Sequence, residues 1–150
     1  HNPILHGRRG AALILLERYD EAIDDYSILM ALKPTFLWAR VIRGDAYAAV
    51  GKNCEAIEDY TAFINLHPEY AETYVNRGKA WHNLAEYEKA IEDLSRAIEL
   101  SPDLAEAYYH RGLSRESSGM KMPAVADYRM AAQLGDANAQ KLLKDRNIFQ

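Results

Sequence analysis

Residues 74–102, YVNRGKAWHNLAEYEKAIEDLSRAIELSP, contain two short amphipathic helical patterns separated by Leu84-Ala85-Glu86. In the second pattern, apolar residues recur at the three- and four-residue spacing that places them on one face of a helix: Ala90, Ile91, Leu94, Ala97 and Ile98. Pro102 has no backbone N–H and cannot continue this helix, so the chain turns there. A single helical hairpin cannot bury both of its apolar faces. This segment is therefore predicted to pack against similar neighbours.

The segment is one copy of a motif that recurs with a period of 34 residues. Each copy has an arginine-glycine pair and, on the second predicted helix, an aspartate: Arg9-Gly10 with Asp25, Arg43-Gly44 with Asp59, Arg77-Gly78 with Asp93, and Arg111-Gly112 with Asp127. The first three copies end at Pro34, Pro68 and Pro102, whereas the fourth has Asp136 at this position. A fixed period over nearly the whole chain predicts an array of stacked repeats, each touching its neighbours.

The motif resembles the tetratricopeptide repeat. Tyr74-x-x-Arg77-Gly78-x-x-Trp81, followed by Ala90-x-x-x-Leu94 and Pro102, is similar to the family pattern W-x2-L-G-x2-Y…A-x3-F…P. Arginine replaces the leucine of the family pattern, and leucine or tyrosine fills the large apolar position of the second helix. The resemblance covers about residues 3–138. It implies an all-α fold, in which four helical hairpins form a right-handed α-α superhelix, or solenoid.

We expect residues 1–150 to form a single domain, with repeats at about 3–36, 37–70, 71–104 and 105–138. Residues 137–146 are predicted to form a C-terminal capping helix, because apolar residues alternate there with charged ones at helical spacing. Ala139, Leu142 and Leu143 would face inward, and the outward residues would be Lys141, Lys144, Asp145 and Arg146. Since the chain begins at His1 without a methionine, we expect a processed chain or an excised fragment.

Composition argues against several functional classes. A net charge of −4 is unfavourable for binding nucleic-acid phosphates. The single cysteine, Cys54, permits no internal disulfide and no cysteine metal quartet. No apolar run is long enough for direct membrane insertion. Because we find no nucleotide-binding loop and no nucleophile elbow, we predict no enzymatic activity, no cofactor and no metal. A weaker alternative is a hydrolase or transferase whose catalytic domain lies outside this chain.

The recurring arginine and aspartate have two interpretations. Four arginines could bind an acidic ligand, or each could pair with an aspartate on an adjacent second helix. Equal numbers in a fixed register favour the pairing. The recurring glycine costs about 1 kcal/mol relative to alanine inside a helix. We therefore predict that two helices approach each other closely at this position.

The resemblance further implies that the first helices of the hairpins line a concave groove, which holds a peptide or helical segment of a partner protein. In the first two copies the groove positions are Ile4, Gly7, Arg8, Ala11, Ile14, Leu15, Trp38, Val41, Ile42, Asp45, Ala48 and Ala49. Core packing does not explain the large aromatic residues Trp38 and Tyr109 at such positions, and we interpret them as binding anchors. Over all four copies we select as partner-binding residues Ile14, Trp38, Val41, Asp45, Asn76, Lys79, His82, Asn83, Tyr109 and Leu113.

Two further hypotheses concern the same surfaces. Some tetratricopeptide domains bind chaperone tails with lysine and asparagine, but this chain has Gly7 and Ala11 at those positions, so that ligand is not expected. His82 and His110 suggest a metal site or a pH switch, but no third ligand accompanies them. The alternative to peptide binding is a scaffold subunit that forms homo-oligomers through its apolar first helix, with Leu13, Leu15 and Leu16 as contacts.

Overall fold

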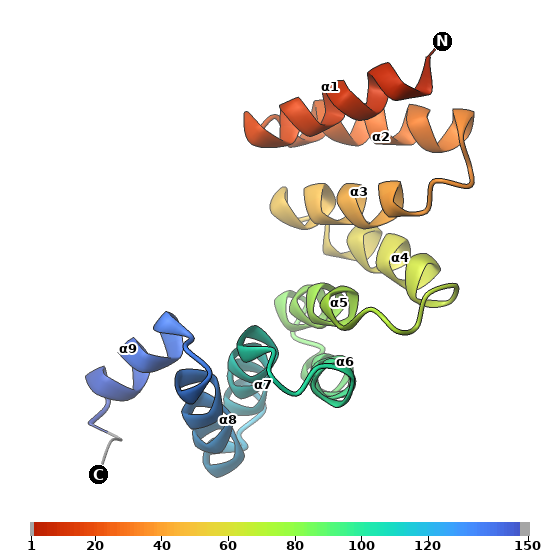
Figure 1. Ribbon diagram of the computed structural model, residues 1–150. Coiled ribbons are helices and arrows are strands. Elements are labelled where there is room, and N and C mark those ends of the chain that lie inside the picture. Colours follow the sequence, from red (N-terminus) through yellow and green to blue (C-terminus); the bar gives the residue numbers. More distant parts are fainter. Residues whose placement is uncertain (1, 148–150) are drawn as a thin grey trace. The chain divides into compact units, whose positions relative to one another are not determined.

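The computed structural model describes residues 2–147, and this part of the chain is all-helical, as predicted (Figure 1). It contains helices α1 (Pro3–Leu15), α2 (Tyr19–Leu32), α3 (Trp38–Ala49), α4 (Asn53–Ile64), α5 (Ala71–Asn83), α6 (Tyr87–Leu100), α7 (Ala105–Ser117), α8 (Lys121–Gln133) and α9 (Ala137–Asp145). Successive helices pack as antiparallel pairs, α1 with α2, α3 with α4, α5 with α6, and α7 with α8. Each predicted repeat therefore contains one helix pair.

The chain divides into two compact units, residues 1–68 with α1 to α4 and residues 69–150 with α5 to α9. In the first unit, α2 packs against both α1 and α3. In the second unit, α6 packs against both α5 and α7, and α9 packs on α8. The expectation of a single domain stays a prediction.

Local signals in the sequence explain where helices begin and end. The turns inside the four hairpins each contain one residue with a left-handed backbone, at equivalent positions: Glu17, Gly51, Ala85 and Gly119. Glycine adopts this conformation without steric cost, and two of the four copies use it. Asp136, which replaces the repeat proline, accepts a hydrogen bond from the backbone N–H of Ala139 at 2.8 Å and so caps the start of α9.

The repeated glycine lies where the two helices of a hairpin touch. A Cβ atom added to Gly10, Gly44 or Gly112 would lie 2.9, 2.8 or 2.6 Å from a ring atom of a tyrosine on the second helix, which is Tyr26, Tyr60 or Tyr128. At Gly78 the same atom would lie 2.8 Å from Cγ of Leu94. These distances are too short for carbon atoms, so the predicted close approach is confirmed.

The repeated arginine and aspartate form the predicted ion pairs. In the second hairpin, Arg43 donates from Nε and Nη2 to the two carboxylate oxygens of Asp59, at 2.7 and 2.8 Å. The other pairs are Arg9–Asp25, Arg77–Asp93 and Arg111–Asp127. All four aspartates are buried. Each pair therefore satisfies a buried charge with two charge-assisted hydrogen bonds.

Gly10→Ala and Gly7→Ala, three residues apart on α1, should have opposite effects on stability. The Cβ at position 10 meets the Tyr26 ring, and we expect a loss of about 1–3 kcal/mol from overpacking. The Cβ at position 7 meets only Cδ2 of Leu29, at 3.4 Å. Gly7→Ala should therefore gain up to about 1 kcal/mol from helix propensity. Urea denaturation followed by circular dichroism measures both, and equal effects would contradict the assigned helix contact.

Candidate functional site

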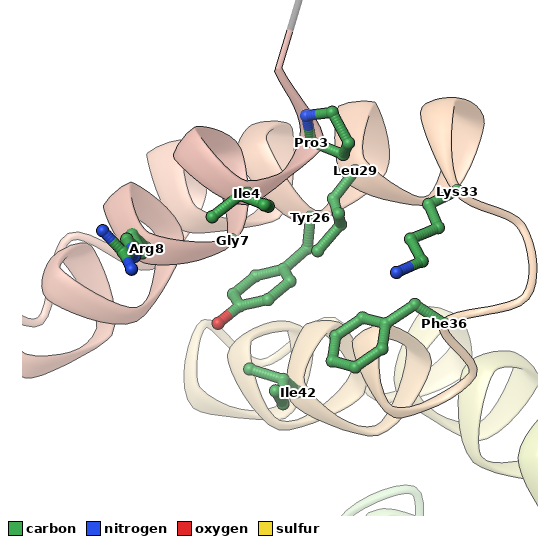
Figure 2. A pocket seen from close by; sticks show the side chains of 9 residues that line it. All are labelled: Pro3, Ile4, Gly7, Arg8, Tyr26, Leu29, Lys33, Phe36 and Ile42. Atoms are coloured by element: carbon green, nitrogen blue, oxygen red, sulfur yellow. The ribbon is translucent and has the colours of Figure 1, made fainter.

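An apolar pocket lies in the first unit between α1 and α3 (Figure 2). Its volume is about 400 Å³. Figure 2 shows the Tyr26 ring, carried by α2, lying between the two other helices, with the Phe36 and Ile42 side chains on the α3 side. The complete lining consists of Pro3, Ile4, Gly7, Arg8, Tyr26, Leu29, Lys33, Phe36 and Ile42. Four of these residues, Ile4, Gly7, Arg8 and Ile42, occupy groove positions implied by the family resemblance.

Gly7 explains why there is space at this position. The equivalent residue is Val41 in the second copy, Val75 in the third and Tyr109 in the fourth. Val41 and Val75 are buried, with 8% and 1% of their surface exposed. In the second unit α5 and α7 also contact each other directly. Gly7 has no side chain to fill the corresponding volume. The pocket therefore occupies space that a side chain fills at the equivalent position of the other copies.

The hydroxyl group of Tyr26 differs in its hydrogen bonding from the equivalent hydroxyls of Tyr60 and Tyr128. The Tyr60 hydroxyl donates to Oδ1 of Asp45 at 2.7 Å, and the Tyr128 hydroxyl donates to Oε2 of Glu116 at 2.8 Å. In the first copy, the positions of these two acceptors hold Ala11 and Ile14. Within residues 2–147 the Tyr26 hydroxyl has no hydrogen-bond partner, although only 3% of Tyr26 is exposed.

The electrostatic state of this hydroxyl follows from its surroundings. Burial and the nearby Asp25 raise the pKa of Tyr26 above its usual value, so the phenol stays protonated and keeps its donor. No fully buried side-chain oxygen or nitrogen in the described chain lacks a partner. The Tyr26 oxygen must therefore retain some access to solvent. Tyr26 lines the pocket, so a ligand there can contact its side chain.

Two cationic side chains also line the pocket. Arg8 and Lys33 are exposed, and neither forms an ion pair with any other residue between 2 and 147. The neighbouring Arg9, in contrast, is held by Asp25. The pocket thus combines apolar walls, one hydroxyl donor and two cations without carboxylate partners.

The partner-binding residues predicted in the first unit lie outside this pocket. Val41 is buried, which corrects its prediction as an exposed contact. Trp38 is 41% exposed, but its ring centroid lies 4.7 Å from that of the buried Phe63, so packing accounts for one face of the ring. Asp45 is exposed and accepts the hydrogen bond from Tyr60. Ile14 is half-buried against the core cluster of this unit.

Of the three proposed self-association residues, one is buried and two are exposed. Leu13 is only 7% exposed and belongs to the core cluster with Tyr26 and Leu29, which corrects its prediction as a surface contact. Leu15 and Leu16 are exposed. The helical pattern of α1 alone did not distinguish these cases, because α1 is apolar on nearly all sides.

Several predicted contacts in the second unit are engaged within that unit. Lys79 forms an ion pair with Glu106 at 2.8 Å, and the His82 ring is 2.9 Å from the Ser114 hydroxyl. Tyr109 and Leu113 pack against the core cluster of Ala124, Tyr128 and Leu143. Core packing therefore does account for Tyr109, contrary to the sequence-based inference, and it accounts for one face of Trp38. Asn76 is half-buried, and Asn83 is exposed.

The two histidines do not form a metal centre with other described residues. Between residues 2 and 147, no group of three histidine, cysteine or acidic residues is placed to hold a metal ion. Burial lowers the pKa of His110 to about 4, and this desolvation outweighs Glu106, 3.7 Å away. Burial also lowers the pKa of His82. His110 is thus neutral near pH 7.

No helix in the described range is long and apolar enough to cross a membrane.

Comparisons with known proteins agree with this architecture. A family model described as TPR repeat matches residues 86–119, which run from the start of α6 through α7. A solved structure named MamA is 29% identical, with a TM-score of 0.79, covering 84% of this chain and 74% of that one. Residues 86–119 thus match a tetratricopeptide repeat, and the chain has the fold of tetratricopeptide-repeat proteins. No curated protein matched the sequence.

Two further structures with lower identity show the same tetratricopeptide fold. MamA from Desulfovibrio magneticus RS-1 is 22% identical with a TM-score of 0.85, covering 89% of this chain and 75% of that chain. A thermophilic TPR protein from Thermus thermophilus is 23% identical with a TM-score of 0.77, covering 90% of this chain and 75% of that chain. Tetratricopeptide-repeat proteins are generally non-enzymatic interaction modules. The general role supported for this chain is protein interaction or scaffolding.

Removing three equivalent hydroxyls should show which tyrosines have internal partners. Tyr60→Phe and Tyr128→Phe each delete a hydrogen bond to a carboxylate, and we expect a loss of about 1–2 kcal/mol. Tyr26→Phe deletes a hydroxyl without an internal partner, so its free energy of unfolding should change by less than about 0.5 kcal/mol. Urea denaturation checks all three. A comparable loss for Tyr26→Phe would show that its hydroxyl has an internal acceptor.

Proposed function

We propose that this tetratricopeptide-repeat protein binds an extended segment of a partner protein and inserts one apolar side chain of that segment into the pocket of the first unit. The observation that carries the proposal is the pocket at Gly7, which lies at groove positions and is walled by Ile4, Phe36 and Ile42. An open apolar pocket with a few polar groups at its edge suits a single side chain. Its volume of about 400 Å³ leaves room for leucine or phenylalanine.

Burial of one side chain does not by itself give tight binding. Removing a leucine or phenylalanine from water contributes about 1.5–3 kcal/mol. A dissociation constant of about 1 mM already corresponds to about 4 kcal/mol, so further contacts must contribute. A contact with the exposed part of Trp38 is a proposed addition within the first unit. Asn76, Lys79 and Asn83 stay predicted partner-binding residues of the second unit.

Gly7→Val should block the pocket without harming the fold. Valine occupies the equivalent position in α3 and α5, and in α1 its methyl groups would extend from the Cβ that lies 3.4 Å from Leu29. The probe is a short acetylated and amidated peptide with a central phenylalanine flanked by glutamines. NMR titration should show shifts at Ile4, Phe36 and Ile42 in the wild type. In Gly7→Val the affinity should fall by about tenfold or more.

Gly7→Ala is the graded control, because it adds one methyl group and should weaken binding less than valine does. Urea denaturation of both variants verifies that the fold is retained. If the wild-type pocket resonances do not respond to the peptide, or if Gly7→Val binds it equally well, the proposed function is wrong.

Self-association through α1 is the second candidate function. Leu5 is 62% exposed and Ala12 is also exposed, whereas the equivalent residues of α3, Ala39 and Ala46, are completely buried. Ala39 belongs to the cluster that also contains residues of α2. The corresponding face of α1 is thus apolar and uncovered within the described chain. A second copy could dock there, with Leu16 at its edge.

Sedimentation equilibrium over a wide concentration range tests this candidate. If α1 mediates assembly, the wild type should form a concentration-dependent dimer, and the double change Leu5→Gln with Leu16→Gln should weaken it by at least about tenfold through lost apolar burial. Both leucines are exposed, so the fold should be unaffected. A wild type that stays monomeric throughout would eliminate this candidate and leave peptide binding.

A further inference from the structure

We infer that the segment bound in the pocket of the first unit is acidic as well as apolar: a carboxylate next to the inserted side chain accepts a hydrogen bond from Tyr26 and lies between Arg8 and Lys33. This inference rests on the proposed peptide-binding function and specifies its ligand. Two independent features of the described residues support it. One is a hydroxyl donor that lacks the carboxylate acceptor present in two other copies, and the other is a pair of cations without carboxylate partners.

The unused donor is identified by comparison within the chain itself. Tyr26, Tyr60 and Tyr128 occupy the same position on their second helices, and each packs against the glycine of its own first helix. The latter two donate to a carboxylate on that helix. Tyr26 presents the same phenol to its glycine, but Ala11 and Ile14 provide no side-chain oxygen as acceptor.

The Tyr26 hydroxyl retains some access to solvent, so in the free protein it can donate to water. A ligand that displaces this water must supply an acceptor, and a carboxylate forms the stronger, charge-assisted bond. Its oxygen would stand where Asp45 and Glu116 place theirs in the second and fourth copies. The missing chemical group is therefore defined by the protein's own repeats.

The charges around the pocket favour the same ligand. Figure 2 shows Arg8 and Lys33 at opposite sides of the pocket, with the Tyr26 ring between them. Neither cation has a carboxylate partner in residues 2–147, in a chain whose net charge is −4. An extended peptide with acidic residues on both sides of its apolar side chain would place a negative charge near each cation. A peptide with lysines at these positions would be repelled.

Three short acetylated and amidated peptides test the inference. They share a central phenylalanine and differ only in its flanking residues, which are glutamate, glutamine or lysine. By NMR titration of the full chain at low salt, the glutamate peptide should bind about tenfold more tightly than the glutamine peptide. The lysine peptide should bind most weakly. Raising the salt concentration should reduce the glutamate preference, because the Arg8 and Lys33 charges are exposed and screened.

Ala11→Asp supplies the carboxylate from the protein. It reproduces the Asp45 arrangement beside Tyr26, so it should abolish the preference for glutamate while the glutamine peptide still binds. Ala12→Asp is the matched control, since it adds the same charge to the next residue of α1, which is exposed and does not line this pocket. It should retain most of the preference. Tyr26→Phe should lose the part of the preference that depends on the hydrogen bond.

The outcomes separate the two proposals. If the glutamate and glutamine peptides bind the pocket equally, the acidic specificity is wrong and the peptide-binding function stands. If neither peptide shifts the pocket resonances, both are wrong. If these resonances shift when the protein alone is concentrated, a second copy occupies the pocket, and the inference is overturned as well.

Discussion

The buried ion pair between arginine and aspartate is the constraint on which the rest of this structure depends. Each aspartate carries a charge inside a helix pair, and its arginine supplies a two-pronged counter-charge. His6, Arg40 and Arg115 are second cationic partners of Asp25, Asp59 and Asp127. In two hairpins the arginine also reaches the preceding one, where Arg43 donates to Ser27 at 2.9 Å and Arg111 donates to Ser95 at 3.1 Å. One side chain thus fixes the pairing within a hairpin and the stacking between hairpins.

The ion pairs also distinguish arginines that are bound to a buried aspartate from cations that are accessible to a ligand. Arg9 and His6 both contact Asp25, and the hydrogen bond from Arg9 is the main reason that the pKa of Asp25 lies below its usual value. Arg8 is adjacent in sequence but lines the pocket instead and has no such partner. The charges of the four repeated arginines are therefore balanced by their aspartates. Near the pocket, the positive charge comes from Arg8 and Lys33.

The sequence predicted the features that depend on register alone. The period of 34 residues identified the helix pairs, the arginine–aspartate pairs and the close contact at each glycine. These features recur at the same position of every copy, even though the surrounding side chains differ. It did not predict burial correctly at Leu13, Val41 or Tyr109, since burial depends on which surfaces surround a position. The pocket was missed for a related reason. Its signal was visible, however, in the change from Val41, Val75 and Tyr109 to Gly7.

A pocket formed by the absence of one side chain has a consequence for how such arrays diversify. Any hairpin in the array could acquire a comparable recess by a single change to glycine at the same position, and could lose it again by a single change back. The recess costs some packing energy, but it requires no new backbone and no insertion. The location of a binding site along the array would then be set by one small residue. Its chemical preference would be set separately, by whether the neighbouring tyrosine already has a carboxylate of its own.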